Sequence, residues 1–494
     1  MGQAPDAGLW RRSRIQQQQR RGPKSERTTS SPHPDSASSA YTAFLERKAQ
    51  LDGMSGFEPL WMPDFLFPFQ QALTEWAIRK GRGALFEDCG LGKSPQELVW
   101  AQNVHQYTGK PVLILTPLAV TFQMVDEAAK FGIESEISRD GKPSGPITIT
   151  NYDRLHLFAS DDYGGVVCDE SSAIKAFDGV RRALVTEFLR KMPYRLAATA
   201  TAAPNDYIEL GTSSEALGYL GHMDMLSRFF TNKQKTSKAY GGKWRDDKGW
   251  RFKGHAEEPF WRWVASWARA MRRPSDLGFE DGGFLLPALE YRQHIVTAVT
   301  PDETTLFDMP ASGLHEERAE LRRTISERCE QAAELLDGVK AGIAWCHLNA
   351  EGDLLARLIP GAVQVAGSDS PDEKEAKLAA FTRGDIRVLV TKPKIGAWGL
   401  NWQHCHRMTY FPDYSYESHY QAVRRCWRFG QTQPVTVDVI TTPGGANALA
   451  ALQRKSGQAD RMFTSLVAHM RHGMDVRRGA IYDKNVEVPS WAKS

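Results

Sequence analysis

Short apolar runs recur in two separate stretches of the chain. Each run is rich in valine, isoleucine and leucine and is bounded by polar residues, glycine or proline, which is typical of strands buried on both faces of a parallel sheet. Helix-like segments separate the runs, so the pattern predicts two α/β units. The first series comprises residues 111–116, 147–152, 166–168 and 196–198, and the second comprises residues 343–345, 363–365, 388–391, 408–411 and 435–440.

Three further regions differ from these units in composition. Residues 1–40 contain seven serines and seven Lys+Arg against three acids, which predicts a disordered basic tail. We place the first unit at residues 41–222 and the second at 291–442, with a basic, aromatic insert at 223–290 and a helical extension at 443–494. Whether the tail contacts nucleic acid stays open, because a solvated tail explains the same composition.

The overall composition argues against several classes of protein. The 494 residues carry 62 Lys+Arg against 59 Asp+Glu, so a surface that attracts nucleic acid must be local. The six cysteines form no C-x-x-C pair, which argues against a disulfide framework and a structural zinc site. The longest apolar stretch without charge, residues 111–125, is too short and polar to span a bilayer. We therefore expect a cytoplasmic protein with no membrane partner.

A glycine-rich segment at residues 86–95 reads F-E-D-C-G-L-G-K-S-P, directly after an apolar run and before a helix-like segment. Glycines let consecutive backbone N–H groups turn toward phosphate oxygens, and the helix N-terminus adds positive potential. The pattern indicates a phosphate-binding loop, although Glu87 stands where the older form of the motif has glycine. Lys93 is expected to reach the β- and γ-phosphates and Ser94 to bind Mg²⁺. The candidate nucleotide-binding residues here are Gly90, Leu91, Gly92, Lys93 and Ser94.

An acidic pair ends the apolar run at residues 166–168. Asp169 is a candidate to hold Mg²⁺ and Glu170 to polarise the attacking water, as an NTPase site requires. Taken alone, an acidic pair at a strand end is explained by solvation. Because the pair follows Lys93 in the order that an NTPase requires, the two signals together predict ATP and Mg²⁺ as cofactors.

Further motifs resemble those of superfamily 2 helicases and translocases, most closely the Swi/Snf-like subgroup. The segment L-F-P-F-Q that ends at Gln70 is similar to the family element that reads adenine. Residues 112–120 and 149–152 are similar to loops that touch the nucleic-acid backbone. The resemblance covers about residues 60–470 and implies two RecA-like lobes with an ATP cleft between them. It also implies DNA contacts from Thr116, Pro117 and Asn151.

The second unit carries its own motifs in the family's order. Residues 367–381 resemble a G-S-x-x-x-x-x-R pattern with a downstream phenylalanine, except that Lys374 stands where arginine is usual. Residues 394–401 look like the glycine-rich motif that lines the cleft, which implies a nucleotide contact from Gly396. Thr391, at the end of the preceding apolar run, is a further expected DNA contact.

The most specific match is Q-A-V-R-R-C-W-R-F-G-Q at residues 421–431, in which Gln421, Arg425 and Arg428 are expected to be catalytic. On a helix, the two arginines would share one face and point into the cleft between the lobes. There they would stabilise the charge of the transferring phosphoryl group. A basic, solvated helix explains the neighbouring Arg424.

The motif expected to couple the ATP state to the track departs from the family pattern. Thr199 and Thr201 are kept, but alanines at positions 200 and 202 replace the usual glycine and proline. The acidic motif reads D-E-S-S where the subgroup has D-E-A-H, so Ser172 would have to replace a histidine contact. These departures motivate a rival hypothesis, a nucleotide-gated DNA-binding scaffold with little turnover.

Residues 231–273 concentrate positive charge and tryptophan, with twelve Lys+Arg against four acids and five tryptophans. Cations interleaved with aromatic rings suit a nucleic-acid track. Three tryptophans lie on a helix-like stretch and fit either a core or a DNA-binding role: Trp261, Trp263 and Trp267. The basic residues expected to contact DNA are Lys243, Arg245, Arg272 and Arg273, the last two from the family resemblance.

The resemblance implies an ATP-dependent DNA translocase or helicase that couples Mg-ATP hydrolysis to movement on DNA. Duplex DNA is the favoured partner, with forked or single-stranded DNA as alternatives, and we expect a monomer in a bacterial or phage-infected cell. The nearest rival among enzymes is an RNA helicase of the DEAD-box kind.

Overall fold

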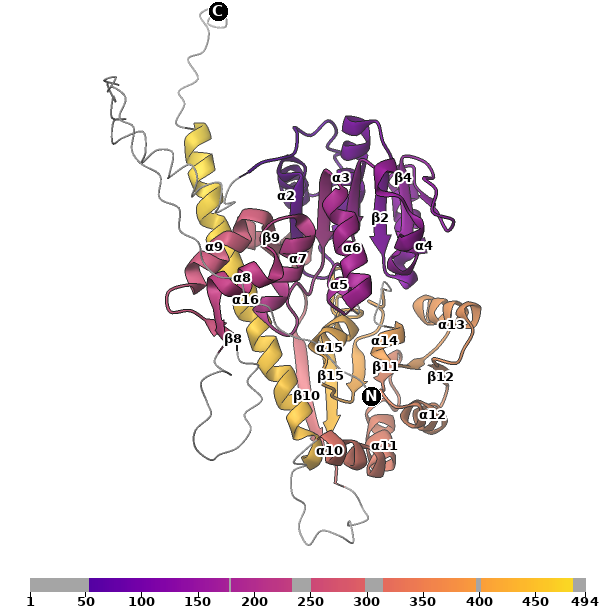
Figure 1. Ribbon diagram of the computed structural model, residues 1–494. Helices are drawn as coiled ribbons and strands as arrows, with labels where there is room; N and C mark the ends of the chain where they lie inside the picture. The colour runs from indigo at the N-terminus through magenta and orange to yellow at the C-terminus, as the bar shows by residue number, and fades with distance from the viewer. Residues whose placement is uncertain (1–52, 177–178, 233–249, 298–313, 397–400, 483–494) are drawn as a thin grey trace, which may run out of the picture. The chain divides into compact units, whose positions relative to one another are not determined.

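The computed structural model of the chain describes residues 53–176, 179–232, 250–297, 314–396 and 401–482 (Figure 1). The predicted tail at residues 1–40 lies outside these ranges, as do the predicted DNA contacts Lys243 and Arg245. The described residues contain two β-sheets in which every neighbouring pair of strands is parallel, and one separate antiparallel hairpin. The predicted two-lobe α/β fold is confirmed.

The first lobe surrounds a seven-stranded sheet with the order β3-β4-β2-β5-β6-β1-β9. Alternate residues of β2 enter different apolar clusters: Val112 and Ile114 join one, and Leu113 and Leu115 join the other. Both faces of the sheet are therefore covered, which explains why its strands are short apolar runs. The strands are β1 (Arg82–Glu87), β2 (Val112–Thr116), β3 (Glu136–Ile137), β4 (Ile147–Asn151), β5 (Gly165–Cys168), β6 (Tyr194–Ala198) and β9 (Ala268–Met271).

The helices of the first lobe begin and end at recognisable signals. Pro68 opens α2, where its missing N–H and fixed φ suit the first turn. α3 begins directly after Gly92 and is capped at its carboxyl end by Gly109, and both glycines are in the left-handed conformation. α3 packs against β2, β5 and β6 and thereby carries the end of the glycine-rich loop to the centre of the sheet. The helices are α2 (Pro68–Lys80), α3 (Lys93–Thr108), α4 (Thr121–Lys130), α5 (Ala173–Ala176), α6 (Gly179–Lys191), α7 (Leu210–Leu217) and α8 (His222–Phe229).

The second lobe surrounds a six-stranded sheet with the order β10-β15-β14-β11-β13-β12. β15 is buried along its whole length, as its continuous V-T-V-D-V-I-T run predicts. The strands are β10 (Leu289–Ile295), β11 (Gly342–Trp345), β12 (Ala362–Val365), β13 (Val388–Thr391), β14 (Arg407–Tyr410) and β15 (Val435–Thr441). The helices are α10 (Leu314–Arg323), α11 (Ile325–Leu335), α12 (Asn349–Leu358), α13 (Pro371–Arg383), α14 (Pro393–Gly396) and α15 (Tyr416–Val423).

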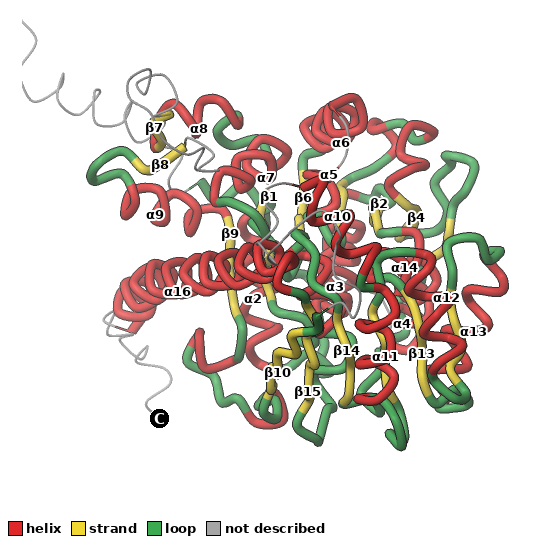
Figure 2. The backbone as a smooth tube through the Cα atoms, turned by 90° about the horizontal axis from the view of Figure 1, so that it is seen from below, coloured by secondary structure: helices red, strands yellow, loops and turns green. Residues whose placement is uncertain are grey.

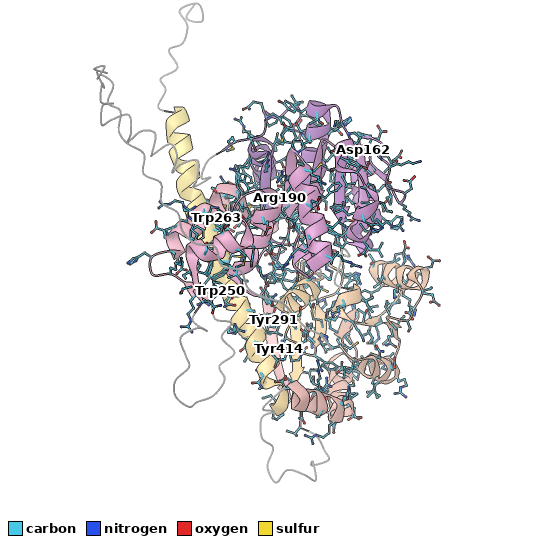
Figure 3. All side chains as sticks on the ribbon, viewed as in Figure 1. Asp162, Arg190, Trp250, Trp263, Tyr291 and Tyr414 are labelled. Atoms are coloured by element: carbon cyan, nitrogen blue, oxygen red, sulfur yellow. The ribbon has the colours of Figure 1, made fainter. Side chains whose placement is uncertain are left out.

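The stretch assigned to the insert contributes to the core of the first lobe. β7 (Phe230–Asn232) and β8 (Trp250–Phe252) form the hairpin, and α9 (Glu257–Trp267) leads into β9, which pairs with β1. Trp261, Trp263 and Trp267 are at most 2 % exposed and pack among aromatic rings, so these three tryptophans are core residues. Figure 3 labels Trp263 on α9 and Trp250 on β8.

The long helix α16 (Ala446–Tyr482), labelled in Figure 2, contributes side chains to the cores of both lobes. Leu452 and Ala459 join the apolar core around the second sheet, whereas Leu466 and Met470 join the core around the first. The helix contacts α9 and β9 of the first lobe and α15 of the second. Among the described helices, α16 included, none is long and apolar enough to cross a membrane.

Candidate nucleotide-binding site

The glycine-rich loop leaves the carboxyl end of β1 and turns into α3. Gly90 and Gly92 have φ angles of 90° and 77°, in the left-handed region that disfavours other residues. A Cβ atom on Gly92 would lie 2.3 Å from the Gln70 side-chain nitrogen, and one on Gly90 would lie 2.9 Å from the backbone nitrogen of Phe429. Both glycines are therefore required by conformation and by close approach, and the second contact comes from the other lobe.

Lys93 lies folded over this loop. Its Nζ donates hydrogen bonds to the backbone oxygens of Glu87 at 3.0 Å and Asp88 at 3.3 Å. Burial lowers the pKa of Lys93, but the anionic groups around it, Glu170 among them, outweigh burial and raise it. The lysine therefore stays positively charged at the position where the sequence predicts phosphate binding.

Gln70 lies directly against the loop. Its Nε2 donates a hydrogen bond to the backbone oxygen of Leu91 at 2.8 Å, while its Oε1 accepts one from the backbone N–H of Phe67 at 2.9 Å. The Phe67 ring contacts Phe284, which in turn contacts Phe429 of the second lobe at 4.6 Å between ring centroids. The residue predicted to read adenine thus lies next to the phosphate loop and beside a group of aromatic rings.

The acidic pair follows β5, beside the glycine-rich loop. Glu170 has a φ of 47°, an uncommon conformation for a residue with a side chain, and such outliers cluster at functional sites. Its Oε2 accepts a hydrogen bond from Thr199 Oγ1 at 3.3 Å. The backbone of Asp169 is fixed by Tyr152, whose hydroxyl donates a hydrogen bond to the Asp169 backbone oxygen at 2.7 Å. Burial, with the neighbouring Glu170 charge, raises the pKa of Asp169 to about 7.

The coupling segment reaches both the acidic pair and the second lobe. Thr199 contacts Glu170, and Thr201 Oγ1 donates to Glu417 Oε1 on α15 at 3.2 Å. The two threonines singled out by the sequence therefore lie between the acidic pair and the helix that precedes the arginines. Ser172 takes no comparable part, because within the described residues its buried hydroxyl makes no hydrogen bond.

Two buried carboxyl groups beside Lys93 were not predicted. Glu87 accepts a hydrogen bond from Gln96 Nε2 at 2.8 Å, and burial raises its pKa to about 7. Glu97 is fully buried, neither of its oxygens has a hydrogen-bond partner among the described residues, and burial followed by the Asp169 charge raises its pKa. The available signal was helical spacing, because Glu97 follows Lys93 by four residues on α3 and shares its face.

The arginines of the second lobe lie on a turn rather than on a helix. α15 ends at Val423, so the prediction that Arg425 and Arg428 share a helix face is wrong. The chain turns there because the Trp402 N–H binds the Arg425 backbone oxygen at 2.9 Å and Gly430 adopts a φ of 89°. The turn still delivers Arg428 to the first lobe, since a Cβ on Gly90 would lie 3.4 Å from the Cβ of Arg428.

The individual contacts hold these two arginines in place. Arg425 Nε donates to the Gln421 backbone oxygen at 3.2 Å, and Arg428 donates to Asn401 Oδ1. Burial, followed by the Arg425 charge, lowers the pKa of Arg428 to about 10. Gln421 itself is 1 % exposed, and its amide has no hydrogen-bond partner among the described residues.

Arg424 is the residue that the sequence interpretation assigned wrongly. It is 6 % exposed rather than solvated, and its guanidinium forms an ion pair with Asp88 of the glycine-rich loop. Its guanidinium carbon lies 4.2 Å from the Trp427 ring centroid and 5.3 Å from that of Tyr420. The repeated arginine in the sequence therefore has a partner in the first lobe.

The predicted DNA contacts lie at the carboxyl ends of parallel strands, but not all are at the surface. Pro117 is half-buried after β2, whereas Thr116 and Asn151 are buried at the ends of β2 and β4. Thr391, at the end of β13, is fully buried, and its hydroxyl donates to the Val365 backbone oxygen at 3.1 Å. A Cβ on Gly396 would lie 2.8 Å from Thr391 Cγ2, so this glycine packs against the strand end.

The two basic residues that follow β9 differ from each other. Arg272 forms an ion pair with Asp460 of α16 at 2.7 Å and lies over the Phe463 ring. The side chain of Arg273 is 61 % exposed and lies 3.8 Å from Asp276. Arg272 thus joins the first lobe to the long helix, and Arg273 is the more accessible of the two.

No family model matches the chain. The chain is similar to human lymphoid-specific helicase, with 29% identity over 125 residues, which is 25% of this chain and only 15% of that protein. The solved SWI2/SNF2 ATPase core of Sulfolobus solfataricus in complex with dsDNA is 17% identical, and the alignment covers 83% of this chain and 96% of that one with a TM-score of 0.39. The sequence match is to a protein named a helicase, which agrees with the resemblance to superfamily 2 helicases that the motifs predict.

Proposed function

We propose that this protein is an ATP-driven motor that moves on DNA. The observation that carries the proposal is the close approach of the Gly90 backbone to Arg428 and Phe429, two segments more than 300 residues apart in the chain. A phosphate-binding loop needs no arginine from another lobe merely to bind a nucleotide. A hydrolase gains from that arrangement, because a supplied arginine stabilises the charge of the transferring phosphoryl group.

The residues of the first lobe fit a triphosphate with Mg²⁺. Ser94 is the second residue of α3 and Asp169 directly follows β5, next to the charged Lys93. No group of three or more His, Cys, Asp or Glu side chains that would hold a metal occurs in the described residues. This suits Mg²⁺ in a nucleotide site, because it uses one or two protein ligands together with phosphate oxygens and water. When bound, Mg²⁺ would neutralise charge that develops on the phosphates.

Each residue then has a separate role in hydrolysis. Lys93 moves from the Glu87 and Asp88 backbone oxygens to the β- and γ-phosphates when the nucleotide enters. Glu170, oriented by Thr199, accepts a proton from the attacking water. Arg425 and Arg428 face the γ-phosphate from the second lobe. Hydrolysis is therefore fast only while the lobes are closed.

The track is proposed to be duplex DNA. The nucleic-acid loops would use the surface near Pro117, where the exposed Leu118 and Phe122 follow, and the basic side chain of Arg273. The relative with the matching segment is named a helicase, which agrees with a nucleic-acid substrate. Alternate gripping by the two lobes during the ATP cycle would move the protein along one strand.

The decisive experiment is an ATPase assay on the full chain with single-stranded DNA, duplex DNA, forked DNA and RNA. Stimulation by duplex DNA supports the proposal. Stimulation by RNA alone would instead favour the DEAD-box-like rival. Nucleotide and DNA binding without turnover would favour the scaffold, for which the unpartnered Ser172 hydroxyl is the specific observation.

A further inference from the structure

The contact between Asp88 and Arg424 joins the two lobes at the edge of the candidate site. Asp88 belongs to the glycine-rich loop and Arg424 follows α15, so the ion pair connects residues of opposite lobes. Both side chains are at most 8% exposed. The motif Q-A-x-x-R-x-x-R specifies no residue at position 424. The sequence pattern therefore gave no sign that Arg424 pairs with Asp88.

The Asp88 carboxylate is fully occupied. One oxygen accepts hydrogen bonds from the Tyr420 hydroxyl and from the backbone N–H of Cys89, and the other accepts from Arg424. Two of these three donors come from the second lobe. If the lobes separated, the carboxylate would therefore exchange both of them for water.

Arg424 is equally constrained. Its guanidinium lies near the Tyr420 and Trp427 rings, and the Trp427 indole N–H donates to the Pro287 backbone oxygen at 2.7 Å. Aromatic rings on its sides exclude water and strengthen the attraction to Asp88. Removing one member of such a pair leaves a buried charge without compensation.

The position of this pair links the two groups that act on the nucleotide. The backbone oxygen of Asp88 accepts a hydrogen bond from Lys93, and Arg424 directly precedes Arg425. A shift at either side chain would therefore displace the phosphate-binding lysine relative to the arginines. The pair is therefore placed to fix the relative position of the two lobes when they close.

We propose that the Asp88–Arg424 ion pair, supported by the Tyr420 hydroxyl, is an interlobe latch that positions Arg425 and Arg428 against the glycine-rich loop. The two latch residues act through their neighbours Lys93 and Arg425, so they are positioning residues. The expected effect of the latch on ATP turnover rests on the proposed function. Its expected effect on the relative position of the two lobes does not, because that position can be measured without ATP turnover.

The test uses spin labels at two exposed positions of the full chain, V180C on α6 and E375C on α13, with the distance measured without nucleotide. The six native cysteines are buried, which leaves the two introduced thiols as the accessible ones among the described residues. D88N and R424Q should each broaden the distance distribution and shift it from that of the parent. The double variant should match the single variants, because both remove one interaction. Unchanged distributions in both single variants would overturn the proposal.

A kinetic measurement separates the latch from general damage to the fold. R424Q should lower kcat roughly 10- to 100-fold while nucleotide affinity changes little, because it removes the partner in the second lobe and leaves the Cys89 and Lys93 contacts within the loop in place. R424K should recover part of the rate, since it restores the charge without the planar guanidinium. Equal loss in both variants through an affinity defect would count against positioning.

The matched control is R262Q, which removes an arginine from an exposed pair with Glu258 on α9. It should change neither the distance distribution nor kcat. Absence of ATPase activity in the parent protein with every nucleic acid would refute the proposed function, while the label distances would still decide the latch.

Discussion

The two lobes have similar parallel sheets but bring opposite charges to their shared site. The first lobe contributes the carboxyl groups of Glu87, Asp88, Glu97, Asp169 and Glu170 around a single lysine. The second contributes three arginines within five residues, all close to the end of α15. The difference teaches that, under the proposed function, neither lobe alone would hold a complete hydrolytic site. The acids and the lysine would organise the nucleotide, and the arginines would arrive only with the other lobe.

The largest effect should come from removing the cation of the first lobe. K93A is expected to abolish measurable DNA-stimulated ATP turnover, because no other cation of the loop reaches the phosphates. K142A, at an exposed site of the same lobe, is the control and should retain the parent rate. ATPase assays with duplex DNA check both variants, and an unchanged rate in K93A would remove the assigned site.

The next effect should come from the cation of the second lobe. R428A is expected to slow hydrolysis by about 10³- to 10⁵-fold, the usual contribution of a supplied arginine. Nucleotide affinity should stay close to that of the parent, because most of the proposed nucleotide contacts come from the first lobe. Single-turnover hydrolysis and equilibrium binding of a labelled ATP analogue measure the two quantities separately. Parallel loss of both would argue that Arg428 binds ground-state nucleotide.

A smaller effect concerns the buried acids of the first lobe. The pKa of Glu87 rises from 4.5 to about 7 on burial, so the folded state holds this proton more tightly than the unfolded state does. Its contribution to the free energy of unfolding is therefore full below about pH 4.5 and declines as pH rises toward 7, by about 3 kcal/mol.

E87Q tests this dependence, because the amide can still accept the hydrogen bond from Gln96 but cannot ionise. Chemical denaturation from pH 4.5 to 7.5 should give a steeper loss of stability in the parent than in the variant. Parallel curves would mean that Glu87 titrates normally in the folded protein.

The smallest effect should come from the hydrogen bond between Thr201 and Glu417. T201V removes the hydroxyl while keeping the shape of the side chain, and a hydrogen bond to a charged group contributes about 1.5–3 kcal/mol at most. We expect a modest fall in the stimulation of ATPase by DNA, with the basal rate nearly unchanged. T382V, which removes a hydroxyl from the Trp402 contact within the second lobe, is the comparison. Equal effects of the two variants on stimulation would contradict a coupling role for Thr201.

The sequence predicts the parts of this fold that depend on local burial. β2, β4, β13 and β15 are fully buried runs rich in Val, Ile, Leu and Thr, because helices or apolar clusters cover both faces of each sheet. The glycine-rich loop was also predictable, since Gly90 and Gly92 occupy backbone conformations that favour glycine. These features leave a signal in a few neighbouring residues.

Other features depend on residues distant in the chain and leave no such signal. β9 reads A-R-A-M and resembles no apolar strand, yet it pairs with β1 because α9 returns the chain to the sheet edge. The end of α15 at Val423 is set by contacts such as Trp402 with Arg425, which no helical spacing predicts. Arg424 was missed for the same reason, because its partner Asp88 belongs to the other lobe.

The placement of α16 has a mechanical consequence. Its side chains are anchored in both cores, and Lys455 donates hydrogen bonds to Asn205 of the coupling segment at 2.7 Å and to the Tyr414 backbone oxygen at 2.6 Å. A continuous helix that packs into both cores resists bending. A large rotation of one sheet against the other must therefore either bend α16 or detach it from one core. Under the proposed function, the stiffness of α16 would limit how far one lobe can move against the other in each ATP cycle.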